Sequence, residues 1–430
     1  MTRPLHIAIV GSGIAGNLVA HRLHAAGHHI TMYEADDHVG GHTHTHAIEL
    51  QGEAHQVDTG FIVFNDRTYP NFIALLDEMG VASQPSSMSF SVRNDARGLE
   101  YNGSSLNGLF AQRRNLVRPG FLGMLAEILR FNRVAPAWLE LSDEETTLRE
   151  LLREHRFDGR FAADYLVPMG AAIWSTDPAR MLDFPARFFV RFLHQHGMLT
   201  VNDRPEWRVI RGGSARYVER LIAPWRHCIR LRSPVELVRR RQDAVQLQVR
   251  GKPPATFDHV FLACHADQAL RLLADASREE REILGAFPYQ QNEAVLHTDT
   301  SLLPRARRAW AAWNYHVLPV AGQGVALTYN MNILQGLRAR HTFCVSLNAS
   351  AQIARRHVLR RLSYAHPLFT TASIAAQRRH AEISGVRRTH YCGAYWRYGF
   401  HEDGVVSALM ALRRFESTRD HAQRDLSRVA

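Results

Sequence analysis

The residues best placed to do chemistry are three closely spaced glycines near the N-terminus. Gly11, Gly13 and Gly16 form the pattern GxGxxG directly after a short apolar run. In such a turn, Gly11 permits the tight bend, Gly13 lets the backbone approach a pyrophosphate, and Gly16 lets the following helix pack closely on the strand. Ile14 and Ala15 begin that helix, where free N–H groups and the positive dipole end attract phosphate. These residues therefore predict a site for a cofactor that carries a pyrophosphate.

The elements that must position these glycines follow from the residues on either side. The run before them is mostly apolar, which is typical of a buried parallel strand, and residues 14–25 carry apolar side chains at helical spacing. A second strand ends at Glu34, which lies 18 residues after Gly16 and is followed by Ala35. An acid at this distance binds the ribose hydroxyls of a dinucleotide. A glycine turn without a ligand is the alternative, and the flanking elements favour the cofactor.

Three histidines directly after Gly40 and Gly41 raise the question of a metal site. His42, His44 and His46 alternate with other residues, so a strand would place them on one face, where three imidazoles could bind zinc. No nearby carboxylate or cysteine completes an obvious ligand set. We therefore predict no metal here and interpret the segment as part of the cofactor site.

The stretch EADDHVGGHTHT, residues 34–45, resembles the signature of a flavoprotein superfamily that contains amine oxidases, protoporphyrinogen oxidases and phytoene desaturases. In that superfamily the acid is followed by a Gly-Gly-Arg turn that touches the flavin side of FAD. Gly40 and Gly41 match the turn, His42 stands where arginine is usual, and Thr43 follows. The resemblance implies FAD contacts at all four residues, without a fixed positive charge at the third. The spacing around Cys392 does not match the known covalent attachment, so non-covalent FAD is expected.

A second stretch near the C-terminus, YCGAYWRYGFHEDGVVSALMALRRF, resembles the second flavin motif of the same superfamily. There a Gly-aromatic-x-acid-Gly turn leads into a helix whose N-terminus faces the flavin ring and stabilises its anionic reduced form. The resemblance implies such a helix from Val405 onward. It implies flavin contacts at Gly393, Glu402, Asp403, Gly404 and Val405. Relatives often carry an acid after the first glycine to bind the ribityl chain; it is missing here, so Asp403 or another group is expected to replace it.

Phrases spread over nearly the full length resemble one bacterial family of predicted NAD/FAD-binding flavoproteins, the more specific being PMGAAIWSTDPARMLDFPARFF, GGSARYVERL and GFHEDG. The resemblance implies an α/β fold: a Rossmann-type FAD-binding domain, glutathione-reductase-like and of the amine oxidase type, with an interleaved α+β substrate domain. The FAD-binding domain is expected at residues 1–68, 207–275 and 386–430, and the substrate domain at 69–206 and 276–385. Val235 lies where related flavoproteins place a strand whose backbone meets the adenine.

The same family resemblance carries the expected reaction. Members are often encoded beside methyltransferases similar to cyclopropane-fatty-acid synthase, and one branch is associated with desaturating methylated acyl chains of membrane phospholipids on the way to furan fatty acids. The resemblance implies an FAD-dependent desaturase that passes a hydride to flavin N5 and is reoxidised by oxygen, with a lipid substrate and a fatty-acid methyltransferase partner. The candidate catalytic residues are His401, Tyr398 and Trp396, with His401 as a base near neutral pH.

Two other functions stay open on the sequence. A flavin amine oxidase would suit the aromatic residues Tyr395, Trp396 and Tyr398, because amines favour aromatic cages. Many amine oxidases hold a lysine near flavin N5, however, and the sole lysine, Lys252, lies in a turn-like stretch far from the flavin motifs. The third interpretation is a non-catalytic flavoprotein that scaffolds a methyltransferase.

Composition and charge narrow the partners. The net charge of +11 permits nucleic acid, an anionic membrane surface or an acidic ligand, but the basic residues are dispersed and no nucleic-acid-binding module is recognisable. Nucleic acid is therefore not expected. Residues 104–141 mix apolar faces with five arginines and only Glu127 and Glu140 as acids. This pattern is typical of a helix on an anionic membrane surface or at the entry to an apolar tunnel; a helical domain with a solvated basic face is the alternative.

The remaining features bear on localisation. The four cysteines are scattered, which favours a reducing compartment. No signal peptide is recognisable, and no apolar stretch reaches the length of about 20 residues that a spanning helix needs. A cytoplasmic protein is expected, with peripheral attachment to the inner membrane if the basic segment binds lipid.

Overall fold

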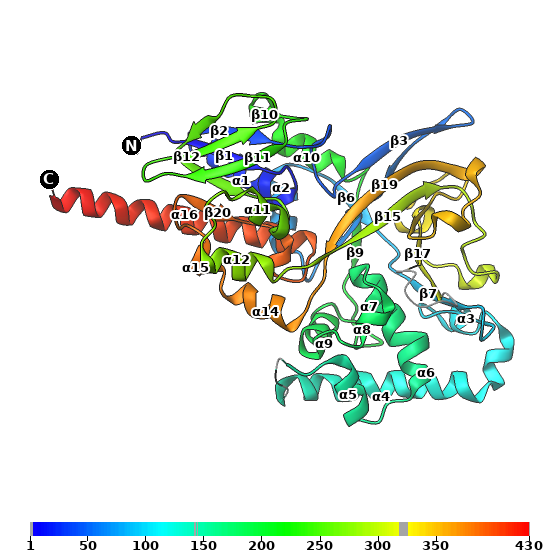
Figure 1. The fold of residues 1–430 in the computed structure, drawn as a ribbon. Helices are drawn as coiled ribbons and strands as arrows, with labels where there is room; N and C mark the ends of the chain where they lie inside the picture. The colour runs from blue at the N-terminus through cyan, green and yellow to red at the C-terminus, as the bar shows by residue number, and fades with distance from the viewer. Residues whose placement is uncertain (1–2, 142, 144, 318–325, 430) are drawn as a thin grey trace.

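The computed structural model describes residues 3–141, 143, 145–317 and 326–429. Five parallel strands form the sheet to which the N-terminal glycine turn belongs (Figure 1). In spatial order they are β10 (Ile229–Arg230), β2 (His29–Tyr33), β1 (His6–Val10), β14 (His259–Leu262) and β20 (Thr389–Tyr391). The predicted Rossmann-type parallel sheet is thus confirmed.

Both faces of this sheet are covered, which explains the apolar run of β1. Ile7 and Ile9 pack on one face with α1 (Ile14–Ala25), α10 (Ala215–Ile222) and α16 (His401–Val429). Ala8 and Val10 pack on the other, because successive side chains of a strand point to opposite faces. The cover on that second face consists of β11 (Val235–Arg240), β12 (Val245–Val249), β13 (Ala255–Phe257), α11 (Ala266–Leu272) and α12 (Arg278–Gly285).

The chain enters this unit three times. Strands β1 and β2 come from its beginning, β10 and β14 from its middle, and β20 from its end. All five strands lie within the segments expected for the FAD-binding domain, whose limits stay a prediction.

A second, seven-stranded sheet forms the other half of the molecule and is antiparallel except where β16 pairs with β7. Its order is β19 (Val358–Pro367), β15 (Tyr289–His297), β18 (Cys344–Leu347), β17 (Leu327–Asn330), β16 (Trp313–Val317), β7 (Phe90–Asn94) and β8 (Leu99–Asn102). The long strands β15 and β19 run from the first unit into the second (Figure 1).

Helices pack together with this sheet in one apolar core and form the lower layer of Figure 1. The main ones are α4 (Pro119–Leu141), α5 (Leu148–Glu154), α7 (Val167–Trp174), α8 (Pro178–Met181) and α9 (Ala186–Gln195). A π-helical turn, Ala162–Leu166, leads into α7. Proline begins α4 and α8, where the first N–H has no partner within the helix and a missing one costs nothing.

Shorter elements complete the two units and the connections between them. These are β3 (Thr45–Leu50), β4 (Glu53–Asp58), β5 (Val63–Asn65), α2 (Pro70–Glu78), β6 (Ser83–Pro85), α3 (Leu106–Leu109), β9 (Trp207–Ile210), α13 (Met331–Leu334), α14 (Thr371–Arg378) and α15 (His380–Ile383), with the 3-10 turns η1 (Arg113–Val117), η6 (Arg355–His357) and η7 (Ala394–Trp396). Within the described part of the chain, no helix combines the length and apolar character needed to cross a bilayer.

Candidate functional site

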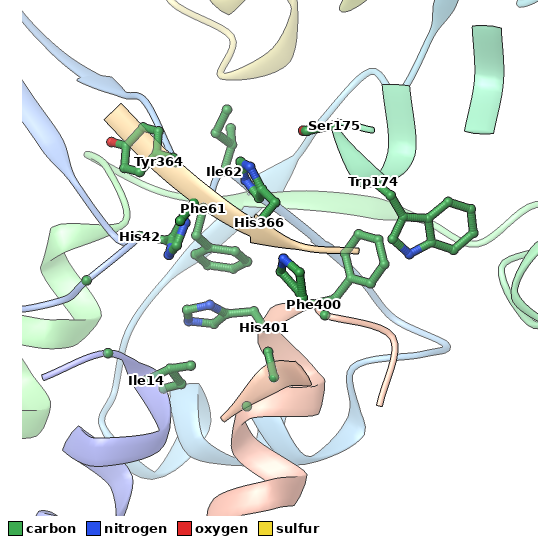
Figure 2. Close-up of a pocket in the computed structure, with 18 of the residues that line it drawn as sticks. Ile14, His42, Phe61, Ile62, Trp174, Ser175, Tyr364, His366, Phe400 and His401 are labelled. Atoms are coloured by element: carbon green, nitrogen blue, oxygen red, sulfur yellow. The ribbon is translucent and has the colours of Figure 1, made fainter. Parts of the chain in front are cut away.

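One cavity of about 1120 Å³ extends from the glycine turn after β1 to the seven-stranded sheet (Figure 2). Its cofactor end is lined by the glycine turn, the end of β2 and the segment around His42. Its apolar end is lined by Tyr101, Tyr165, Met169, Ala172, Trp313, Tyr329, Leu347 and Leu362. The predicted site residues that line the cavity are Gly11, Gly13, Ile14, Ala15, Glu34, Ala35, Gly40, Gly41, His42, Val235, Gly393, Tyr398, His401 and Gly404. Those that do not are Gly16, Thr43, Trp396, Glu402, Asp403 and Val405.

The glycine turn has the geometry that its spacing predicts. Gly11 has a φ of +100°, and a Cβ on Gly16 would lie 2.0 Å from the carbonyl oxygen of Gly11. A Cβ on Gly13 would meet no protein atom within 4 Å. The first and third glycines are therefore required by the protein itself, whereas the space beside the second is left for a ligand.

Two helices present their N-termini to this end of the cavity. A Cβ on Gly404 of α16 would lie 2.7 Å from Cγ2 of Ile14, so the glycine lets α16 approach the start of α1. Helix α1 has no side-chain cap at Gly13 and no acid in its first turn. Its first N–H groups and its positive dipole end therefore remain available to an anion such as a pyrophosphate.

The acid at the end of β2 is held by the same turn. Oε2 of Glu34 accepts hydrogen bonds from the backbone N–H of Ser12 (2.8 Å) and from its hydroxyl (2.5 Å), and Oε1 accepts from the N–H of Asp36 at 3.0 Å. Val235, at the start of β11, lines the cavity on the same side. The residue predicted to bind the ribose, Glu34, and the strand predicted to meet the adenine are thus brought to one end of one cavity.

The segment after Gly41 places an unpaired ring nitrogen beside this space. His42 is half-buried, and its ring centroid lies 5.1 Å from that of Tyr364 and 5.3 Å from that of His366. Its Nε2 is buried and has no hydrogen-bond partner. Burial, followed by the neighbouring His366, lowers the pKa of His42 well below its usual value, so the ring is neutral. Because a buried polar nitrogen without a partner is costly, this atom is what a polar ligand atom in the cavity would satisfy.

The family of the chain follows from a family model that matches residues 14–300, well over half of the sequence, and that describes flavin containing amine oxidoreductases. The chain belongs to this family. It is an FAD-dependent oxidoreductase, as the sequence resemblance implies. The open space at Gly13, the uncapped α1 and the unpartnered Nε2 of His42 all fit that cofactor.

Individual relatives agree on the fold and differ in chemistry. The L-amino-acid oxidase of Bungarus fasciatus is 43% identical over 51 residues, a match that covers 12% of this chain and about a tenth of that relative. Among solved structures, a fatty acid isomerase from P. acnes superposes with a TM-score of 0.70 at 15% identity, covering 96% of this chain and 99% of that one. Cyclohexylamine oxidase from Brevibacterium oxydans IH-35A gives a TM-score of 0.69 at 15% identity, with 97% and 100% covered. At such identities the likeness shows the amine oxidase fold alone.

Within this flavin amine oxidoreductase, His401 lines the cavity, and its part as a base stays a prediction. Burial lowers its pKa to about 3, so accepting a proton near neutral pH is unfavourable. Its Nε2 lies 2.7 Å from the hydroxyl of Tyr217, whose oxygen lies 2.7 Å from Oγ1 of Thr43. Its ring stacks on Phe61 with centroids 3.6 Å apart. His401 is therefore a neutral ring fixed at the start of α16 (Figure 2). Thr43 does not line the cavity and acts on His401 only through the hydroxyl of Tyr217.

The two acids of the C-terminal motif hold backbone elements together. Glu402 accepts hydrogen bonds from the backbone N–H groups of Asn71 and Phe72 at 3.1 and 2.9 Å, and so caps the first turn of α2. Asp403 accepts from the N–H of Phe400 at 2.9 Å and pairs with Arg397. The hydrogen bond from Phe400 to Asp403 lets α16 begin at residue 401, earlier than the predicted start at 405. Neither carboxylate lies in the cavity wall.

Of the two aromatic residues predicted to be catalytic, one lines the cavity and the other does not. Trp396 is buried against Phe287, His380 and Tyr395, on the side of η7 away from the cavity. Tyr398 does line the cavity. Its ring lies 4.5 Å from that of Phe188, and its carbonyl oxygen accepts from Nε1 of Trp174 at 3.1 Å. Trp174, Phe192, Tyr398 and Phe400 together form one aromatic wall between the two ends.

The three histidines after Gly41 do not form one group. His44 stacks between His38 and His46, with ring centroids 3.9 and 4.0 Å apart, whereas His42 turns toward Tyr364 and His366. Among the described residues, no three histidine, cysteine or acidic side chains are grouped to hold a metal ion. The residues that sequence reasoning missed are His265, His366, Tyr364, Phe61 and Tyr217. Of these, Tyr217 lies within the family-like phrase GGSARYVERL and His366 begins a second such phrase, HPLF, so the resemblance pointed to both segments without assigning either residue a role.

Proposed function

We propose that this flavoprotein oxidises an acyl chain, removing two hydrogens from adjacent carbons to form a double bond. The observation that supports this most is the character of the apolar end. Among the described residues that line the cavity, the carboxylates are Glu34, Asp36 and Asp37, all at or just after the end of β2. The wall beyond the aromatic residues offers hydrocarbon and ring surface, which suits a long apolar chain.

For this reaction, residues of the chain position the substrate and exclude water. Trp174, Phe192 and Phe400 form a wall that packs against an apolar substrate and excludes water. FAD held at the glycine turn around Gly13 would supply a hydride acceptor, with oxygen as the final acceptor of the electrons. The second hydrogen would leave as a proton to a base or to water, and the neutral His401 and His42 place no fixed positive charge beside the site. Exposed Arg204, which also lines the cavity, is available to a phosphate headgroup at the entrance.

The finer substrate class comes from the sequence resemblance. We propose a methyl-branched acyl chain of a membrane phospholipid, supplied by a fatty-acid methyltransferase that acts first. A fatty acid isomerase among the structural neighbours is compatible with an acyl chain in this fold.

An amine substrate is favoured less. A protonated amine would need a compensating charge or an amine-activating lysine near the flavin. Lys252 lies between β12 and β13, with its Nζ 3.3 Å from Oγ of Ser233, and does not line the cavity. The aromatic cage that would hold an amine is incomplete as well, because Trp396 faces away. A purely scaffolding role predicts that no substrate reduces the flavin.

The test is an anaerobic incubation of the holoenzyme with detergent-dispersed phospholipids that carry methyl-branched acyl chains. Bleaching of the flavin band, together with a lipid product that has lost two hydrogens, supports the proposal. Straight-chain phospholipid serves as the matched substrate control for the methyl branch. Bleaching by amines alone would replace the proposal with the amine oxidase reading, and no bleaching by either class would leave the scaffold.

A further inference from the structure

The outer face between β8 and the first turn of α4 is unusually apolar for a protein surface. Large apolar side chains point to solvent at Leu106 (75% exposed), Leu116 (52%), Val117 (80%) and Leu122 (42%). The segment that carries them is well packed beneath, because its Phe121 and Met124 are buried against Tyr101. Exposed apolar groups gathered on a well-packed base mark an interaction surface. We call this face, Leu106 to Leu122 with its arginines, the α3–α4 face.

The α3–α4 face is also basic. Residues 101–126 contain no aspartate or glutamate, and the segment carries Arg113, Arg114 and Arg118. The hydrogen bonds of these guanidinium groups go to uncharged oxygens, including the carbonyls of Phe110, Gly98 and Arg97. Among the described residues, none of the three has a carboxylate within ion-pair distance. Their positive charge is therefore not neutralised within the described part of the chain.

The same face borders an opening of the cavity. Gly103 and Ser104 connect β8 to α3, both are exposed, and both line the cavity. Leu106 follows them directly in the chain. The cavity therefore reaches the surface beside the apolar side chains and within a few residues of the arginines.

We propose that the α3–α4 face docks on an anionic phospholipid bilayer. Aliphatic side chains flanked by arginine suit the headgroup–acyl boundary, where the apolar groups enter the bilayer and the guanidinium groups contact lipid phosphates. A protein partner is less well matched, because the exposed apolar groups are leucine and valine, which are under-represented among the residues that dominate protein interfaces. The route of an acyl chain past Gly103 and Ser104 into the cavity rests on the proposed function; the docking itself does not.

The charge part of the proposal is tested by co-sedimentation of the holoenzyme with vesicles of phosphatidylcholine alone or mixed with phosphatidylglycerol. Binding is expected to the mixed vesicles and to weaken with salt. Each arginine near an anionic surface is worth about fivefold in affinity, so Arg113→Glu/Arg114→Glu is expected to bind at least about 25-fold more weakly. The matched control is Arg355→Glu/Arg356→Glu, an exposed adjacent pair on another 3-10 turn, η6, which is expected to bind normally.

The apolar part needs its own pair of variants. Val117→Asp is expected to weaken binding to the mixed vesicles about tenfold, whereas Val386→Asp, at a residue 43% exposed on the other unit, is expected to leave it unchanged. No binding to mixed vesicles, or equal losses in the test and control variants, would overturn the docking surface. Flavin reduction by detergent-dispersed lipid separates the two proposals: reduction without vesicle binding refutes docking alone, and vesicle binding without reduction refutes the acyl-chain reaction alone.

Discussion

The two ends of the cavity are built from different parts of the chain. The cofactor end is walled by backbone, at Gly13, Ile14 and Gly404, where two helix N-termini meet. The apolar end is walled by side chains such as Trp313 and Tyr329 from strands far apart in the sequence. A backbone wall depends on the path of the chain, whereas a side-chain wall can change without moving the fold. This contrast explains how relatives of one fold can share FAD and differ in substrate.

The largest effect is expected where the backbone wall has no spare room. Gly16→Ala would place a Cβ 2.0 Å from the carbonyl oxygen of Gly11, so strand β1 or helix α1 must shift. We expect a loss of about 3 kcal/mol of unfolding free energy and of bound FAD. Urea unfolding and the flavin absorbance of the purified protein measure both. Gly123→Ala, at an open helical position of α4, is the control and is expected to retain both.

The second variant distinguishes an effect on FAD binding from an effect on the stability of the protein. Gly13 has a φ of −65°, which alanine adopts freely, and no protein atom lies near its Cβ position. Gly13→Ala should change the stability of the apoprotein by less than about 1 kcal/mol, because the poorer N-cap is offset by the lower entropy of the unfolded chain. The methyl group meanwhile enters the space for the pyrophosphate. We expect FAD to bind at least about tenfold more weakly. Equal FAD affinity in Gly13→Ala and the parent would show that the pyrophosphate lies elsewhere.

A change at the apolar end should impair the reaction with the substrate and leave FAD binding intact. Ala172 lies on α7 and lines the cavity, so Ala172→Trp fills part of it. We expect FAD affinity to be retained and reduction by the acyl substrate to slow by about a hundredfold, because the chain no longer fits. Stopped-flow bleaching measures the reduction. Ala25→Trp, at an exposed position of α1, is expected to reduce at the parental rate; a parallel loss of FAD in Ala172→Trp would mean that the two ends are not separable.

These two ends also differ in how far the sequence predicts them. The glycine turn and Glu34 lie within 24 residues of each other and on adjacent strands, so their spacing alone places them. His366 reaches His42 from β19, through antiparallel pairing that no local pattern encodes. The stacking partner of His401, Phe61, comes from a loop 340 residues earlier in the chain. Long-range contacts of this kind explain why the cofactor turn could be predicted, whereas the cluster of rings around His42 and His401 could not. We call this set, His42, His366, Phe61 and His401, the ring cluster.

The C-terminal motif shows the same limit at single residues. Its type and position were predicted, but the direction of each side chain depends on neighbours outside the motif. Trp396 turns into the core because Phe287 and His380 offer an apolar contact there. Glu402 turns to α2, whose first N–H groups would otherwise lack acceptors. A flavin contact at Glu402 and a catalytic part for Trp396 therefore stay predictions that these partners do not favour.

The ring cluster predicts how stability depends on pH. Burial lowers the pKa of His366 to about 4 and that of His401 to about 3. Between these values and 6.5, the unfolded chain binds more protons, so stability falls as pH falls. Each ring contributes a slope of about 1.4 kcal/mol per pH unit. Asp403 acts in the opposite direction, because burial raises its pKa to about 7 and the folded protein then keeps the proton.

The test of that slope is His366→Gln. Unfolding free energy measured in urea between pH 6.5 and about 4.5 should fall less steeply in this variant than in the parent, by about 1.4 kcal/mol per pH unit. His194→Gln, at an exposed position of α9, should keep the parental slope. If the His366→Gln slope equals that of the parent, then His366 takes up a proton in the folded protein and the cluster is not neutral.

The last comparison removes one hydroxyl group from Tyr217, which holds His401, and one from Tyr398 in the aromatic wall. In Tyr217→Phe the Nε2 of His401 loses its partner and stays buried, which is expected to cost about 1–3 kcal/mol of unfolding free energy. Tyr398→Phe removes the same atom from a half-exposed ring in the aromatic wall, and a cost within about 0.5 kcal/mol is expected. Urea unfolding of both variants measures the difference. A larger loss in Tyr398→Phe would mean that the side-chain wall is the more tightly constrained one, and the contrast between the two ends would be reversed.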